Sequence, residues 1–173
     1  MKSNAQTIGT NGVEPSRPIL PAEYGVPADK DEFVTWDWVV ERLESAKNYW
    51  VGTTRPDGRP HAVPVWGIWV EDTLYFDGHP DTQWKRNLAQ NPAISVHLES
   101  GDEVVILEGV VEQIPHIDRE RAKQIRAASM KKYSYGSTVE ELVSAGSTAM
   151  RPQVVYAWSE FPKTLTRWRF REE

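Results

Sequence analysis

The sequence predicts an antiparallel β-barrel decorated by helices, and three observations lead to this fold class. Seven segments of the 173-residue chain have the β-rich or alternating apolar pattern of strands. Short turns join most of them, as around Asp57-Gly58 and Gly101, which favours hairpins over the long crossovers of a parallel sheet. Helical spacing occurs in only three or four segments, so a doubly wound sheet with a Rossmann nucleotide site is not expected.

Length, charge and cysteine content narrow the class of protein. A mass of 19.7 kDa suits one domain with its own core. The chain has no cysteine, which excludes disulfides, thiolate metal sites and cysteine nucleophiles. The net charge of −5 disfavours nucleic acid as a partner, and the longest apolar stretch, 62–70, is too short to span a bilayer. With no apolar signal segment at the start, we expect a cytoplasmic protein that binds no membrane.

The N-terminal region differs in composition from the rest. Residues 1–32 contain four of the twelve prolines and no sustained apolar period, which indicates a flexible arm. The barrel domain is expected over 33–173. It begins with a helix at about 35–47, where apolar residues recur at helical spacing and Thr35 is a suitable N-cap.

The strands of the first half are expected at 49–54, 61–70 and 73–78. The Pro56-Asp57-Gly58 turn joins the first two. Pro64 cannot donate to a ladder, so it marks a bulge, an edge or a close approach of the backbone to something other than a strand. A short helix at about 82–90 follows, with Thr82 at its N-cap and Asn91-Pro92 as its stop.

The second half is predicted to begin with a hairpin of strands 94–99 and 103–111, joined at Ser100-Gly101-Asp102. Two helices are expected next, at about 118–132 and 138–145. Strands 153–159 and 165–170 complete the seven.

Eight tryptophans in one small domain require an explanation. For most of them we expect burial in the core or in a subunit interface, where large rings contribute most. The alternative for a minority is the wall of a cleft for a flat ligand.

Familiar catalytic patterns are missing from the chain. It has neither a cysteine nor a Gly-x-Ser-x-Gly elbow, so no nucleophilic triad is predicted. The four histidines lack ligand spacing, and no metal site is expected. The strand–turn–helix unit 74–88 is more informative, because the N–H groups of a helix start near Gly78 to Gln83 suit a phosphate.

A set of ordered segments resembles a known superfamily. These are strand 61–70 after the Pro-Asp-Gly turn, the Tyr75-Phe76 strand, the Arg86-Asn87-Leu88 helix ending in Asn-Pro, strand 94–99, the strand within 101–109, and Thr-Arg-Trp-Arg-Phe at 166–170. Together, over about 33–170, they look like the pyridoxamine 5′-phosphate oxidase-like superfamily, and more narrowly its flavin/deazaflavin oxidoreductase branch. The resemblance implies a split β-barrel of the antiparallel Greek-key type. It also implies a homodimer that binds FMN or the deazaflavin coenzyme F-420 in an interface groove and transfers hydride.

The sequence departs from the FMN-binding pattern at four positions. Members that oxidise vitamin B6 carry basic residues on the second strand and an Arg-Lys pair at the start of the helix. The matching positions here hold neutral residues, namely Val63, Ile68, Gln83 and Trp84. Lys85 and Arg86 are the nearest substitutes. Vitamin B6 oxidation is therefore not expected, and F-420, with one phosphodiester charge, is preferred over the phosphate dianion of FMN.

We expect an F-420- or FMN-dependent oxidoreductase that acts on an unknown small molecule, with no catalytic side chain of its own because the cofactor carries the hydride. The alternatives are a non-catalytic haem- or flavin-binding split barrel and a dimeric scaffold without a ligand. The expected cofactor-binding residues are His61, Val63, Pro64, Val65 and Trp66 beside the ring, Asp77, Gly78, Thr82, Gln83, Trp84 and Lys85 at the phosphoryl tail, and Trp158, Arg167 and Arg169 on the far wall, from either subunit.

Overall fold

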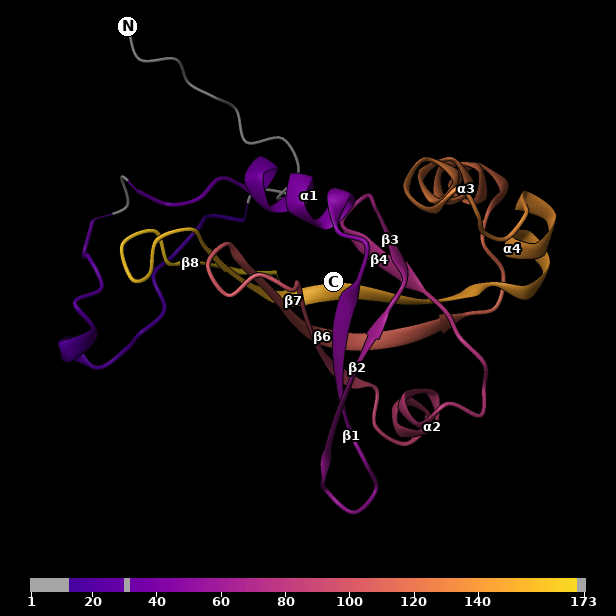
Figure 1. Ribbon diagram of the computed structural model, residues 1–173, viewed down its shortest axis with the longest axis horizontal. Helices are drawn as coiled ribbons and strands as arrows, with labels where there is room; N and C mark the ends of the chain where they lie inside the picture. Colours follow the sequence, from indigo (N-terminus) through magenta and orange to yellow (C-terminus); the bar gives the residue numbers. More distant parts are fainter. Residues whose placement is uncertain (1–12, 30–31, 171–173) are drawn as a thin grey trace, which may run out of the picture.

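The computed structural model describes residues 13–29 and 32–170 (Figure 1). Its strands form one curled antiparallel sheet, and four α-helices pack around it, which confirms the predicted fold class. The strands are β1 (Tyr49–Thr54), β2 (Pro60–Val65), β3 (Gly67–Val70), β4 (Thr73–Phe76), β5 (Ala93–His97), β6 (Val104–Ile114), β7 (Ser147–Trp158) and β8 (Thr166–Arg169). The helices are η1 (Ala22–Tyr24), α1 (Trp36–Ser45), α2 (Gln83–Gln90), α3 (Arg119–Tyr133) and α4 (Val139–Ala145).

The strand order β2-β1-β5-β6-β7-β4-β3 explains how the sheet closes. β2 and β3 lie at opposite ends of this order, yet Trp66 alone separates them in the chain. The sheet must therefore curl until its two ends meet, and we call this meeting point at Trp66 the seam. Pro64 lies in β2, an end strand of the order, where its missing N–H costs little, as the edge interpretation of this proline predicts.

Two predicted strands differ from those observed. The single strand expected at 61–70 is two strands, because the chain turns at Trp66 from one end of the sheet to the other. The strand expected at 153–159 begins already at Ser147. Its first part was missed because Thr148, Ala149 and Met150 are all buried, so the segment lacks the alternation of a strand with one exposed face.

The core consists of two clusters. The larger one fills the barrel and includes Val39 and Leu43 of α1 and Leu88 of α2. The smaller one lies between β3–β4 and the pair α3–α4, where Ile125 and Leu142 pack against the sheet. Four of the eight tryptophans are buried, as expected for core residues: Trp36, Trp69, Trp84 and Trp168.

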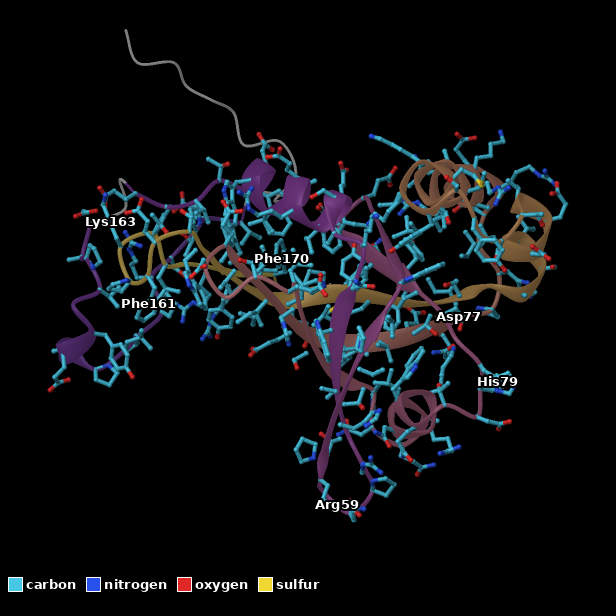
Figure 2. All side chains as sticks on the ribbon, in the orientation of Figure 1. Arg59, Asp77, His79, Phe161, Lys163 and Phe170 are labelled. Carbon is cyan, nitrogen blue, oxygen red and sulfur yellow. The ribbon has the colours of Figure 1, made fainter. Side chains whose placement is uncertain are left out.

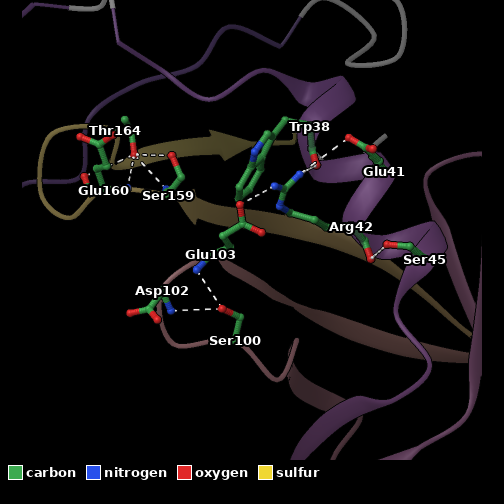
Figure 3. Close-up of polar contacts among 10 residues, drawn as sticks. All are labelled: Trp38, Glu41, Arg42, Ser45, Ser100, Asp102, Glu103, Ser159, Glu160 and Thr164. Atoms are coloured by element: carbon green, nitrogen blue, oxygen red, sulfur yellow. Dashed lines mark hydrogen bonds and ion pairs between the residues drawn. The ribbon is translucent and has the colours of Figure 1, made fainter.

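Helix α1 begins and is held as the sequence predicts. Thr35 is its N-cap, and the Thr35 hydroxyl accepts a hydrogen bond from Trp38 N at 3.1 Å. The Arg42 guanidinium lies over the Trp38 ring at 3.5 Å and binds the Glu103 carboxylate at 2.7 Å (Figure 3). These contacts tie α1 to the turn before β6.

The predicted arm, 1–32, is only partly within the described residues. Ser16 forms a β-bridge with Arg167 of β8, so this part of the arm extends the sheet by one short contact. Beyond it, η1 contacts the loop before β8, where Tyr24 and Phe161 meet edge to face at 6.0 Å. In Figure 1 this region lies at the end of the molecule opposite α3 and α4. No helix in the part of the chain described is long and apolar enough to cross a membrane.

Candidate functional site

The seam exposes a large aromatic ring. Val65, before the turn, is buried, whereas the Trp66 side chain is 58% exposed. One face of its indole stacks on Tyr133 of α3, with the ring centroids 4.7 Å apart and the planes at 8°. Because this stack covers one face of the ring, we infer that the opposite face carries much of the exposed surface. A flat conjugated molecule can stack there, because stacked rings of this kind attract each other.

A groove of about 180 Å³ runs from the seam to the helices α3 and α4. Asp77 follows β4 at one side of it, and Figure 2 shows Asp77 on the segment that leads to α2. The floor is mainly apolar, and the walls carry aromatic and hydroxyl groups. Its lining residues are Trp66, Gly67, Ile68, Tyr75, Phe76, Asp77, Ile125, Arg126, Ser129, Tyr133, Tyr135, Gly136, Ser137, Leu142 and Ser147.

The charges at the β4 side of the groove neutralise each other. Lys85 Nζ lies 2.5 Å from Asp77 Oδ1 and donates to the Thr148 hydroxyl at 2.8 Å. Thr148 is fully buried and also bonds Gln113. Lys85 therefore fastens α2 to β4 and β7 and is not a free cation at the groove.

The start of α2 offers neutral donors. Thr82 occupies the N-cap position as predicted, but its side chain makes no capping bond and donates instead to His79 O at 2.9 Å. The first-turn N–H groups of α2 therefore have no side-chain acceptor at the cap. The Gln83 amide bonds Asn87 at 2.7 Å, and the Arg86 guanidinium bonds Gln83 at 3.2 Å.

Trp84 lies inside the protein. Its ring packs on Phe76 at 5.6 Å and is 5% exposed. A side chain at Gly78 would come within 2.7 Å of this ring, so the glycine allows the β4–α2 segment to pass close over Trp84.

The structure brings some of the predicted site residues together and separates others. Trp66 and Asp77 line the same groove, and Thr82, Gln83 and Lys85 lie at the start of α2. The residues Pro64, Trp158, Arg167 and Arg169 do not line the groove; by strand register Pro64 and Arg167 share the outer face of the sheet. Val63 packs against the larger core cluster, and His61 contacts Arg55 at 3.4 Å.

Sequence reasoning missed the helical wall of the groove. Arg126, Tyr133 and Tyr135 come from α3 and the loop after it, a region read only as a charged helix. The available signal was the Tyr-Ser-Tyr-Gly run at 133–136, since two aromatics beside a glycine at a helix end are unusual for a solvated turn.

Behind the seam lies a half-buried amine. Lys132 Nζ bonds the Tyr49 hydroxyl at 2.8 Å and the carbonyl oxygen of Gly67 at 3.3 Å. Burial lowers the pKa of Lys132 from 10.5 to about 8, opposed in part by the Glu44 carboxylate. Burial likewise raises the pKa of Tyr49.

A second hollow, of about 310 Å³, lies between α1 and the β3–β4 turn. Its charged side chains are all carboxylates, and none of its residues belongs to the predicted set. Trp36 Nε1 donates to Asp72 at 3.3 Å, and burial raises the pKa of Asp72. The lining residues are Trp36, Asp37, Val40, Glu44, Trp69, Glu71 and Asp72.

Solved structures resemble this chain at low sequence identity. A conserved hypothetical protein from Mycobacterium tuberculosis has a TM-score of 0.58 and 19% identity, over 76% of this chain and 89% of that one. A Bacteroides thetaiotaomicron protein named for 5-nitroimidazole antibiotic resistance has a TM-score of 0.56 and 17% identity, over 93% of each chain. A heme binding protein from Mycobacterium smegmatis has a TM-score of 0.54 and 20% identity, over 70% and 52%. These likenesses show the fold alone.

The search for relatives among curated proteins gave no match. The family model for pyridoxamine 5′-phosphate oxidase, in contrast, matches residues 36–159, from the first residue of α1 to just past the end of β7. This match covers most of the chain and includes the seam, the groove and α2. The chain therefore belongs to the pyridoxamine 5′-phosphate oxidase family, and its fold is the split β-barrel of that family.

Proposed function

We propose that this protein is an oxidoreductase that uses F-420 or FMN and binds the cofactor ring at the seam. The observation that carries the proposal is the groove, because it joins two segments that sequence reasoning assigned to one cofactor, the strand end at Trp66 and the β4 end at Asp77. When bound, such a cofactor supplies hydride transfer. The chain's own part is to bind, orient and shield it.

The open face of Trp66 is the proposed support for the ring. Tyr133 holds the indole from behind, so little side-chain entropy remains to be lost on binding. The apolar floor made by Ile68, Tyr75 and Phe76 excludes water from one side of a ring placed here.

The hydrogen-bond donors at the start of α2 favour a cofactor whose phosphoryl tail carries a single negative charge. Lys85 is already paired with Asp77, and Arg86 with Gln83 and a backbone carbonyl. The first-turn N–H groups of α2 remain for a phosphoryl oxygen. These N–H groups suit the single charge of the F-420 phosphodiester. The phosphate dianion of FMN suits them less well, because the basic residues of the FMN-binding pattern, which would form charge-assisted hydrogen bonds to it, are replaced here by neutral ones. We therefore propose F-420 as the preferred cofactor.

Titration of the purified protein with both cofactors tests this proposal. We expect F-420 to bind more tightly than FMN by calorimetry. The carboxylates of its tail are expected to pair with exposed arginines such as Arg86 and Arg169, so the affinity should fall as salt screens these pairs. Tighter FMN binding at low and high salt would overturn the cofactor preference. Binding of haem with neither cofactor would favour the non-catalytic alternative.

The substitution Gln83→Arg gives a sharper test of the tail position. It restores one cation of the FMN pattern at the start of α2, so FMN affinity is expected to rise by about ten-fold or more, as for one charge-assisted hydrogen bond. Gln90→Arg, at the exposed end of the same helix, adds the same charge away from the tail and serves as the control. An equal effect of the two substitutions would show that the phosphoryl group lies elsewhere.

A further inference from the structure

Two strongly exposed aromatic side chains line the groove. Trp66 is 58% exposed at the seam, and Tyr135 is 71% exposed in the loop after α3. Trp66 belongs to the turn between β2 and β3, and Tyr135 to the loop after α3. Exposed rings at a concave surface are typical of sites for flat ligands.

Arg126 contributes the one positive charge among the described residues that line the groove. Its Nη1 donates to the carbonyl oxygen of Gly136 at 2.6 Å. Within the described residues, Nε and Nη2 of Arg126 make no hydrogen bond, so three N–H donors are available to a ligand. No hydrogen bond or ion pair joins Arg126 to the nearby Glu141, whose Oε2 accepts from the Thr138 N–H at 2.7 Å and hydroxyl at 3.0 Å; the Arg126 charge helps to lower the pKa of Glu141.

The loop that carries Tyr135 is held rigidly. Gly136 has φ +152°, and a side chain there would come within 2.1 Å of the Ser129 hydroxyl, so only glycine fits. The Ser129 hydroxyl donates to Tyr135 O at 2.6 Å, beside the Arg126 bond to Gly136. A wall fixed in this way loses little entropy when a ligand binds.

The size of the groove limits its occupant. Its volume of about 180 Å³ lies below the ~300 Å³ at which sites for drug-sized ligands begin, so a substrate held there beside the cofactor ring has at most one or two fused rings. We propose that the α3 end of the groove binds a small planar conjugated acid as substrate: Tyr135 holds its ring and Arg126 binds its carboxylate, while the open face of Trp66 is left to the cofactor ring. The term substrate rests on the proposed function; the binding of the acid does not.

The probe for this inference is 2-naphthoate, with the uncharged 2-naphthamide as its matched control, titrated calorimetrically into protein without added cofactor. Wild-type protein is expected to bind the acid more tightly than the amide. Arg126→Gln should weaken 2-naphthoate by about ten-fold or more and leave 2-naphthamide nearly unchanged, because a charge-assisted hydrogen bond is lost. Tyr135→Ala should weaken both compounds.

Two further variants separate recognition from damage to the loop. Arg126→Lys keeps a positive charge and should recover part of the 2-naphthoate affinity, whereas Arg119→Gln removes an exposed arginine of α3 outside the groove and should change nothing. Equal affinity of wild type and Arg126→Gln for 2-naphthoate, or equal weakening by Arg119→Gln, would overturn the inference. So would the absence of any 2-naphthoate binding to wild type at millimolar concentration.

The same titrations distinguish this inference from the proposed function. Arg126-dependent binding of 2-naphthoate by a protein that binds neither F-420 nor FMN would reject the oxidoreductase and keep the acid site. Binding of F-420 without any effect of Arg126 on 2-naphthoate would do the reverse.

Discussion

Lys132 places a titratable amine behind the seam, and its environment sets the pH dependence of folding. Its pKa is about 8 in the folded protein and 10.5 in the unfolded chain, so the unfolded chain binds more protons between these values. The free energy of unfolding is therefore expected to rise with pH above about 8. Burial raises the pKa of Tyr49 above its ordinary value of 10.0, so stability should fall again above pH 10.

Urea denaturation at pH 7 to 10 measures this dependence. We expect a rise of roughly 1 kcal/mol, after allowance for the part of Lys132 that solvent screens. Lys132→Met should abolish the rise, and Lys131→Met, which removes an exposed neighbour on the same helix, should preserve it. A rise of the same size in Lys132→Met would contradict the assignment.

How far single residues can be predicted depends on whether their role is local. The Thr35 cap and the apolar positions of α1 follow from spacing along one segment, and they are confirmed. The exposure of Trp66 could not be predicted, because it results from where two ends of a sheet meet. The Asp77–Lys85 ion pair was missed for a similar reason: Lys85 also bonds Thr148, 63 residues further along the chain.

At the scale of elements, α2 is tied to the barrel by a buried amide. Asn87 is fully buried; its Nδ2 donates to the Thr53 hydroxyl at 2.9 Å and its Oδ1 accepts from Gln83 at 2.7 Å. Asn87→Leu keeps the size and removes both bonds, so about 1–3 kcal/mol of stability should be lost. At about 2–4 °C per kcal/mol, the Tm should fall by several degrees in a thermal melt.

The control for this variant is Gln90→Leu, which adds the same side chain at an exposed position of α2. Its Tm is expected to stay close to that of wild type, because exposed substitutions cost little. A Tm for Asn87→Leu equal to that of Gln90→Leu would mean that the amide bonds contribute nothing to the docking of α2.

Elements with one exposed face were predicted well, and elements covered on both faces were not. α3 was expected with Ala122 and Ile125 facing inward, and both are buried. In contrast, the start of β7 is covered by the helix pair on one side and by the barrel core on the other, so Thr148 to Met150 carry no period-two signal. The break at Trp66 escaped detection because two short strands in sequence read as one long strand.

At the scale of the whole molecule, the order of the strands lay beyond local reasoning. β6 and β7 form the longest pairing in the sheet, yet α3 and α4 separate them in the chain. Which strands pair across such an insertion depends on how whole faces of the sheet are buried, and residue spacing along the chain does not show this. The split-barrel topology was expected only from the resemblance to a family.

The outer face of the sheet carries a row of large side chains that are not buried. One cross-strand row runs Pro64, Trp50, His97, Ile106, Tyr156 and Arg167, through five strand pairings. None of these six is buried, and Trp50 and His97 stack with their planes at 4°. Large aromatic side chains mixed with arginine are typical of protein interfaces, and a stable dimer covers about 800 Å² on each partner. We therefore propose that a second copy of the chain covers it.

Light scattering at micromolar concentration tests this proposal, and the expected mass is twice the 19.7 kDa of one chain. Ile106→Asp puts a charge at the centre of the row, where covering it without a partner ion is costly, so the dimer should dissociate while the circular dichroism of the fold is kept. Ala127→Asp adds the same charge on the exposed side of α3 and should leave the dimer intact.

If F-420 affinity also falls in Ile106→Asp but not in Ala127→Asp, the second copy supplies part of the site, as expected for Trp158, Arg167 and Arg169. A wild-type mass of one chain would reject both the dimer and this shared site, and would leave the groove at Trp66 as a site within a single chain.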